Sequence, residues 1–197
     1  MRTTIVYNHP YEKSFNHAIL ETVSERAQKM GQDVQVIDLD KEQFNPVMTS
    51  QDLLGFVKHE QIDPQAKQYG QLLAQSDHLV LIFPIWWELM PAMMKGFIDK
   101  VVFPGSFYEY KSDGLMMASK MKNLKTITII TTMNTPKGIY RFVFGNAIQK
   151  SLVRGTFKKA GYKNVKWISL NQVKQSSQEK RQRMLETVAN NISKRLG

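Results

Sequence analysis

Residues 76–102 read SDHLVLIFPIWWELMPAMMKGFIDKVV, and the fold is best approached from this stretch. The run from Leu79 to Phe83 is continuously apolar, which is typical of a parallel strand covered on both faces. Pro84 cannot donate a hydrogen bond to a sheet, so the strand is predicted to end there. Pro91 then opens a helical pattern. We therefore predict a buried central strand, a loop, and a helix.

The loop between this strand and this helix contains Trp86, Trp87 and Glu88. An open α/β sheet binds its ligands at the carboxyl ends of its strands, which is where this loop lies. Packing in the core or on a subunit surface would explain a single tryptophan. Two adjacent tryptophans after a strand-ending proline favour a binding loop, because an indole stacks well on a flat heteroaromatic ring.

Outward from this stretch, strand and helix patterns alternate along the whole chain. Five predicted strands with helices between them indicate a single α/β domain over residues 1–197, a doubly wound five-stranded parallel sheet with strand order 2-1-3-4-5. The predicted strands are 2–8, 33–40, 78–83, 124–131 and 165–170; the predicted helices are 14–31, 64–75, 92–102 and 178–196, with a short helix within 41–63, a loop or hairpin at 106–117 and a loop entering a helix at 140–160.

In that strand order, the carboxyl ends of the first, third and fourth strands converge on one crevice. After the first strand, Ser14 stands at the start of a helix, where free N–H groups favour an anion such as a phosphate. Taken alone, Ser14 is more simply explained as an ordinary helix cap. This loop lacks the glycines of a phosphate-binding loop, so a phosphate there needs side chains. The candidates are His9, Lys13, Ser14 and Asn16 after the first strand, and Thr131, Thr132, Met133 and Asn134 after the fourth.

The composition excludes several classes of site and location. The chain has no cysteine, which removes disulfides, thiolate catalysis and cysteine-based metal sites. His59 and His78 have no metal partners at a recognisable spacing, so we expect no metal site. No apolar stretch is long enough to cross a membrane, and the chain enters its first strand without a signal-peptide pattern. We expect a cytoplasmic protein.

The net charge of +10 is unevenly distributed. Residues 1–149 contain 15 basic and 15 acidic residues, whereas residues 150–197 contain 12 basic and 2 acidic ones. Such an asymmetry marks either a surface for an acidic partner or membrane, or simply a solvated helix face. No aromatic platform or recognition motif accompanies the basic residues, so we expect no nucleic-acid partner.

Four blocks of the sequence carry a family resemblance: His9 with Ser14-Phe15-Asn16, Phe83 to Trp87, the helical block from Pro91 to Val101, and Thr131-Thr132. They resemble the flavodoxin-like NAD(P)H:quinone oxidoreductases, which include DT-diaphorase and the potassium-efflux ancillary oxidoreductases. The resemblance spans most of the chain. It implies that one segment holds the phosphate and ribityl region of a flavin, that another runs along its isoalloxazine ring, and that a third meets its pyrimidine side. Tyr108 and Tyr110 resemble aromatic residues at the pocket mouth, where with Trp87 they would contact substrate. The three segments are His9 with Ser14, Phe15 and Asn16; Pro84, Ile85, Trp86 and Trp87; and Thr131 with Thr132.

The sequence departs from this family pattern in the third segment. Met133 and Asn134 stand where DT-diaphorase-like members have a glycine pair, and the histidine further along that loop is missing. Tyr140 is the nearest candidate catalytic proton donor, with a packing role as its alternative. The long C-terminal extension of the larger members is also absent, so we expect FMN, with FAD left open.

We therefore expect a flavin-dependent NAD(P)H oxidoreductase, with NADPH or NADH as reductant and a quinone or similar flat electrophile as acceptor. The resemblance implies a homodimer with sites at the interface, and the methionine-rich helix 92–102 is compatible with one. The alternative is a flavin-binding ancillary subunit that docks on a membrane or acidic partner through the basic C-terminal quarter. A one-electron carrier of the flavodoxin type fits less well, because such carriers are usually acidic.

Overall fold

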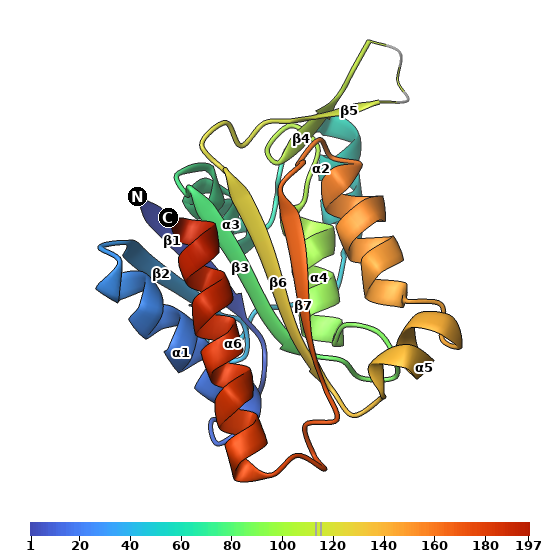
Figure 1. Cartoon of the computed structure of the whole chain (residues 1–197). Helices are drawn as coiled ribbons and strands as arrows, with labels where there is room; N and C mark the ends of the chain where they lie inside the picture. The colour runs from blue at the N-terminus through green and yellow to red at the C-terminus, as the bar shows by residue number, and fades with distance from the viewer. Residues whose placement is uncertain (113, 115) are drawn as a thin grey trace.

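Five strands pair in parallel to form the central sheet of the computed structural model, which describes residues 1–112, 114 and 116–197 (Figure 1). Their order is β2-β1-β3-β6-β7, which is the predicted 2-1-3-4-5 order. The doubly wound prediction is therefore confirmed. The strands are β1 (Arg2–Tyr7), β2 (Asp33–Asp38), β3 (His78–Pro84), β6 (Thr126–Met133) and β7 (Val165–Asn171).

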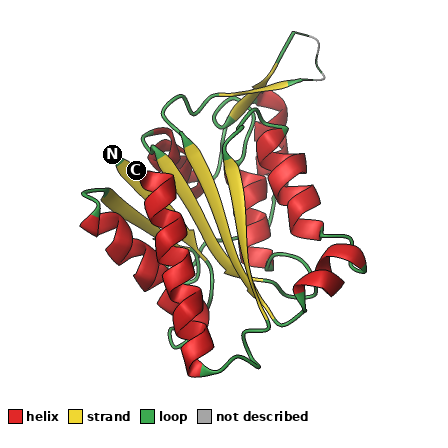
Figure 2. Ribbon diagram, in the orientation of Figure 1, coloured by secondary structure: helices red, strands yellow, loops and turns green. Residues whose placement is uncertain are grey.

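Helices cover both faces of this sheet (Figure 2). On one face, α1 (Phe15–Lys29) and α6 (Gln178–Leu196) pack on Ile5, Val80 and Ile82. On the other, α3 (Pro64–Ala74), α4 (Ala92–Val101) and the π-helix η1 (Gln149–Lys158) pack on Leu79, Leu81 and Ile129. Successive strand residues point to opposite faces, so both faces need apolar residues. This explains the unbroken apolar run of β3, in which every residue is buried.

Capping side chains mark the first turns of α1, α2 and α3. Ser14 is the N-cap of α1, and its side chain accepts a hydrogen bond from His17 N. Asp63 caps α3, and Thr49 with Asp52 forms a capping box on α2 (Ser50–Lys58), the short helix predicted within 41–63. These caps satisfy N–H groups that have no partner within the helix.

Two regions differ from the sequence-based expectation, and a third agrees with it. Strand β6 continues to Met133, because β3 pairs with it as far as Thr132 and β7 as far as Met133, so Thr131, Thr132 and Met133 are strand rather than loop. The segment 140–160 contains the end of α5 (Lys137–Phe142) and then η1, a π-helix. The stretch 106–117, predicted as a loop or hairpin, is part of an antiparallel hairpin of β4 (Tyr108–Tyr110) and β5 (Met117–Ser119). Its positions 113 and 115 lie outside the described residues.

Lys100 falls outside the apolar helical spacing of α4, as Lys95 and Asp99 do, and this spacing alone predicts that it faces away from the core; the structure corrects that expectation. Lys100 is only 3% exposed, because the end of α4 lies against the starts of α2 and α3, whose capping residues Asp52 and Asp63 surround its ammonium group. Within the described part of the chain, no helix combines the length and apolarity that a membrane span requires.

Candidate functional site

A groove of about 750 Å³ runs along the carboxyl ends of β1, β3 and β6. Three segments from distant parts of the sequence meet there, as the strand-end argument predicted. Most of the residues singled out in the sequence line it. The lining residues are His9, Tyr11, Ser14, Phe15, Asn16, Pro84, Ile85, Trp86, Thr132, Met133, Asn134, Val173 and Lys174.

The amino end of α1 forms one wall of this groove. The N–H of His17 is engaged by the N-cap side chain of Ser14 at 3.1 Å. The N–H groups of Phe15 and Asn16 lie in the first turn, where an α-helix offers no carbonyl partner. Together with the positive end of the helix dipole, they make this wall suited to an anion.

Asn16 links this helix end to the neighbouring strand. Its Nδ2 donates to Thr132 Oγ1 at 2.8 Å, although the two residues are 116 positions apart. Its Oδ1 is buried and has no hydrogen-bond partner among the described residues. A buried polar atom without a partner costs free energy, so Asn16 Oδ1 marks a place where a ligand donor would be favourable.

His9 lies beside the amino end of α1, where its neutral imidazole can donate a hydrogen bond. Burial lowers the pKa of His9, against the opposing effect of Asp40. Its Nδ1 accepts a hydrogen bond from Tyr11 N at 3.1 Å, which leaves the proton of the neutral ring on Nε2. The ring meets Trp86 edge-on, with centroids 6.2 Å apart.

The tryptophan loop is a two-residue turn closed by hydrogen bonds between Trp86 and Leu89 in both directions, at 3.0 and 3.1 Å. Its central residues, Trp87 and Glu88, both have positive φ, 48° and 63°. Such a turn normally contains glycine, asparagine or aspartate. Trp86 lines the groove with 47% of its surface exposed, whereas Trp87 is 98% exposed and is not among the residues that line it.

The two adjacent threonines of β6 point to opposite faces of the sheet, because strand side chains alternate. Thr132 faces α1 and the groove through its bond with Asn16. Thr131 accepts a hydrogen bond from Trp167 Nε1 at 2.9 Å on the other face, and its side chain does not reach the groove. Of the pair, Thr132 is therefore placed to contact a ligand with its side chain.

Tyr140 lies behind the tryptophan turn and is not a groove residue. Its hydroxyl donates to the carbonyl of Glu88 at 3.0 Å and accepts from Ile148 N at 3.1 Å. Burial raises the pKa of Tyr140. The ring borders a separate cavity of about 270 Å³, whose other lining residues are Lys137, Arg141, Asn146, Gln149, Trp167, Ser169 and Asn171. Its proposed role as a proton donor stays a prediction.

Tyr108 and Tyr110 lie at the opposite end of the sheet, in the hairpin above the amino ends of the strands (Figure 1). Their rings meet edge to face at 5.5 Å; Tyr108 is buried and Tyr110 is 40% exposed. Tyr162, three residues before β7 begins, ties this hairpin down by donating its hydroxyl proton to Phe107 O at 2.7 Å. Within one chain, these tyrosines are thus not brought to the groove.

Val173 and Lys174 line the groove but were not among the predicted residues. They follow β7, and Lys174 N donates to Asn134 Oδ1 at 3.0 Å. Their position directly after a strand could have identified them, because the fifth strand ends at the same edge of the sheet as the other strands.

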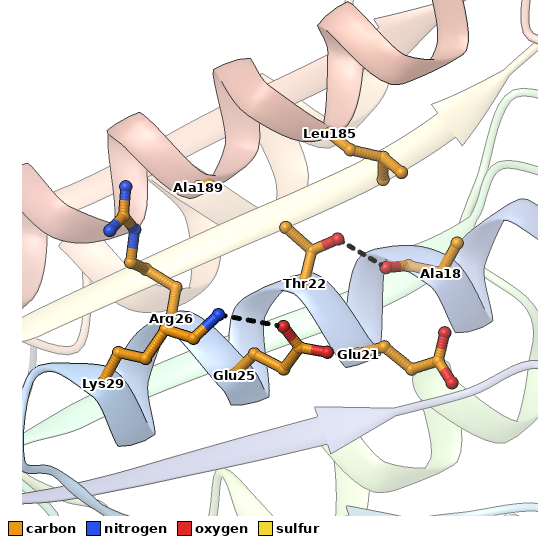
Figure 3. A pocket seen from close by; sticks show the side chains of 8 residues that line it. All are labelled: Ala18, Glu21, Thr22, Glu25, Arg26, Lys29, Leu185 and Ala189. Atoms are coloured by element: carbon orange, nitrogen blue, oxygen red, sulfur yellow. Dashed lines mark hydrogen bonds and ion pairs between the residues drawn. The ribbon is translucent and has the colours of Figure 1, made fainter. Parts of the chain in front are cut away.

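A different hollow, of about 400 Å³, lies between α1 and α6, away from the strand ends (Figure 3). Several of its polar groups are already paired within α1: Thr22 Oγ1 donates to Ala18 O at 2.7 Å, and Lys29 meets Glu25 at 3.3 Å. Unlike the strand-end groove, it presents no buried polar atom without a partner among the described residues.

Comparisons with known proteins find relatives along the whole chain. A family model described as a flavodoxin-like fold matches residues 1–196. An uncharacterized NAD(P)H oxidoreductase of Haemophilus influenzae is 25% identical over 197 residues, which are 100% of this chain and 96% of that protein. NAD(P)H dehydrogenase (quinone) 1 of Cavia porcellus is 28% identical over 164 residues, covering 71% of this chain and 58% of that protein.

Solved structures show the same arrangement of the whole chain. Smu.1420 from Streptococcus mutans UA159 superposes with a TM-score of 0.82 and 33% identity, over 98% of both chains. An FMN-dependent NADH-azoreductase from Bacillus anthracis, solved in complex with FMN, superposes with a TM-score of 0.77 over 100% of this chain and 99% of that one. At 13% identity, the latter shows likeness of fold alone.

Proposed function

Because this chain belongs to the flavodoxin-like fold family, matched over residues 1–196, we propose that it is a flavin-dependent NAD(P)H oxidoreductase that reduces quinones or similar flat electrophiles. Its relatives include NAD(P)H dehydrogenase (quinone) enzymes. FMN is the proposed cofactor, with FAD as the alternative, and NADPH or NADH is the reductant.

The observation that carries this proposal is the fit between the groove and a flavin with a phosphate tail. The free N–H groups at the start of α1 and the Ser14 hydroxyl suit the phosphate. The unpartnered Asn16 Oδ1 suits a hydroxyl donor of the ribityl chain. Ile85 and Trp86 supply an apolar and aromatic wall for the ring, and Thr132 to Asn134 supply polar groups at its edge.

When bound, a flavin supplies the redox chemistry, because its ring accepts a hydride from a nicotinamide and passes one to a quinone. The residues of this chain bind and orient the reactants. Trp86 excludes water from one side of the groove, and His9 offers a neutral Nε2–H as a hydrogen-bond donor. Fixed donors of this kind stabilise negative charge without reorganisation when charge develops.

We further propose a homodimer in which the hairpin of one protomer covers the groove of the other. Tyr108 and Tyr110 lie at the wrong end of their own chain to contact its groove, and Trp87 is almost fully exposed. Exposed apolar side chains on α2, among them Leu53 and Val57, offer a surface that a second copy would cover. Sedimentation analysis of the purified protein tests this state.

The decisive test is reconstitution of the purified protein with FMN or FAD, followed by anaerobic addition of NADPH or NADH. We expect the visible flavin band to bleach with one nucleotide and to return when a quinone is added. Asn16→Ala should weaken FMN binding by about tenfold, the usual effect of losing one or two hydrogen bonds. Thr22→Val, on the same helix but outside the groove, is the control and should leave FMN binding unchanged.

A protein that retains no flavin at saturating FMN or FAD would refute the proposal. An Asn16→Ala variant that binds FMN as tightly as the unaltered protein would refute the assignment of the groove. In that case the fold would stand and the site would have to be sought elsewhere.

The alternative is an ancillary flavin-binding subunit, favoured by one surface feature. Lys150, Arg154 and Lys158 are exposed and follow one another at four-residue intervals along η1. Arg195, by contrast, is bound to Thr128, Ile127 and Asn164 and belongs to the structure. Salt-sensitive sedimentation with anionic vesicles would support docking, whereas robust multiple turnover by the free protein would make it unnecessary.

A further inference from the structure

The turn that carries the two tryptophans is held in an unfavourable backbone conformation. Trp87 and Glu88 both adopt the left-handed region, with φ of 48° and 63°, although neither is a glycine or asparagine. A pair of this kind persists only where the surrounding structure enforces it, and such pairs cluster at functional sites. The contacts that enforce the conformation therefore matter to the site.

Those contacts converge on Glu88. The Tyr140 hydroxyl donates to its carbonyl oxygen at 3.0 Å, and Thr135 Oγ1 donates to its carboxylate Oε1 at 2.7 Å. Both donors are themselves fixed: Ile148 N donates to the Tyr140 hydroxyl at 3.1 Å, and Asn171 Nδ2 donates to the carbonyl of Thr135 at 2.8 Å. The turn after β3 is thus tied to the segments that follow β6 and to the end of β7.

The geometry points to Tyr140 and Thr135 as positioning residues that hold Glu88 in the left-handed region and thereby set the direction of Trp86 and Trp87. Trp86 is kept against the groove and Trp87 is turned out into solvent. This inference rests on the proposed function, because it makes the flavin wall depend on a clamp outside the groove. It assigns Tyr140 a role through Glu88 rather than through contact with reactants.

Tyr162 provides a matched comparison for Tyr140. It too is a buried tyrosine whose hydroxyl donates to a backbone carbonyl, Phe107 O, and accepts from a backbone N–H, that of Met121, at 2.7 and 3.4 Å. It lies near the amino ends of the strands, away from the groove. Removing its hydroxyl measures the general effect of losing such bonds without touching the tryptophan turn.

Two readouts test the clamp. Protein labelled with 5-fluorotryptophan, without flavin, reports the surroundings of Trp86 and Trp87 by fluorine NMR, and titration with FMN reports the groove. We expect Tyr140→Phe to shift or broaden the Trp86 and Trp87 resonances and to weaken FMN binding about tenfold, a loss equivalent to roughly 1.4 kcal/mol. Tyr162→Phe should change neither readout. Thr135→Val should act in the same direction as Tyr140→Phe.

Glycine at position 88 tests the physical cause, because glycine adopts positive φ without steric penalty. In the Tyr140→Phe background, Glu88→Gly should restore both the fluorine spectrum and FMN affinity. A double variant that remains as impaired as Tyr140→Phe would overturn the strain argument. Equal behaviour of Tyr140→Phe and Tyr162→Phe would overturn the clamp while leaving the proposed function intact. If the unaltered protein binds no FMN, the proposed function fails. The fluorine spectra of the flavin-free protein still show whether Tyr140 and Thr135 position the tryptophan turn.

Discussion

Replacing Lys100 by methionine should destabilise the fold strongly, although Lys100 is not a residue of the groove. Its side chain is 2% exposed, and its ammonium group lies 2.7 Å from Asp63 Oδ2 and 3.6 Å from Asp52 Oδ2. Those two carboxylates cap α3 and α2. Gln61 Nε2 donates to the Lys100 carbonyl at 3.0 Å. One buried cation thus joins the ends of three helices.

The magnitude follows from this burial. Methionine keeps most of the side-chain volume, so the main effect is the loss of charge, which leaves the buried Asp52 and the partly buried Asp63 without their cation. Breaking a buried ion pair in this way costs about 3–5 kcal/mol. For a protein of this size, each kcal/mol lowers Tm by roughly 2–4 °C, so the expected fall is about 6–20 °C. Asp63→Asn in the same background should recover at least half of it, because asparagine caps helices well and carries no charge.

The free energy of unfolding of each variant is measured by urea titration followed by circular dichroism. Lys95→Met is the control on the same helix, because Lys95 pairs with Asp99 at 2.5 Å but is 56% exposed. Exposed pairs contribute about 0–1 kcal/mol. A Lys100→Met variant within 1 kcal/mol of the unaltered protein would refute the reasoning.

The same network predicts a dependence on pH. Burial alone would raise the pKa of Asp63, but the Lys100 hydrogen bond and charge, with the N–H groups of Ala66 and Gln65, outweigh it and hold that pKa below its usual range. A carboxylate with a depressed folded-state pKa stabilises the fold above about pH 4 and loses that contribution as the pH falls through the folded-state pKa. The difference between Lys100→Met and the unaltered protein should therefore shrink on acidification to pH 3.

Three further outcomes are expected. Gly96→Ala should lower the free energy of unfolding by about 1–3 kcal/mol or more, because the added Cβ would stand 2.3 Å from Pro46. Gly138→Ala on α5 is the contrast: its Cβ would meet nothing within 4 Å, so the free energy of unfolding should rise by about 0.5–1 kcal/mol, and urea titration measures both. Burial lowers the pKa of His78, so stability should fall as the pH drops below about 6.5, where the unfolded chain gains a proton; His78→Asn should flatten the slope between pH 7 and 5, and the exposed His59→Asn should not. Thr131→Val should cost about 1 kcal/mol by removing the partner of Trp167 Nε1, and should leave FMN affinity unchanged, since the Thr131 side chain lies outside the groove; a large loss of FMN affinity would contradict that placement.

Much of the fold was predictable because local patterns report it directly. The apolar run of β3 indicated a strand covered on both faces, and every residue of β3 is buried. Ser14 was predicted to begin a helix and does so. The alternation of strands and helices indicated a doubly wound sheet, and the order 2-1-3-4-5 was taken from the flavodoxin-like pattern of such sheets. Since ligands of such sheets bind at strand ends, the position of the groove was predicted from the sequence, although the predicted lining residues did not include Tyr11, Val173 and Lys174.

Other features depend on contacts that no local pattern contains. β6 extends to Met133 because Pro84 of β3 pairs with Thr132 and Asn171 of β7 pairs with Met133. Lys100 has the spacing of an exposed residue, yet the starts of two other helices enclose it. Tyr140 meets Glu88 across 52 positions of sequence, and only that contact reveals it as part of the tryptophan turn. The sequence by itself determined the elements, their order and the edge that carries the site, because periodicity and capping act between neighbours along the chain. Tertiary structure alone decided which polar side chains are buried, paired or turned toward the groove, because those outcomes depend on where separate elements meet.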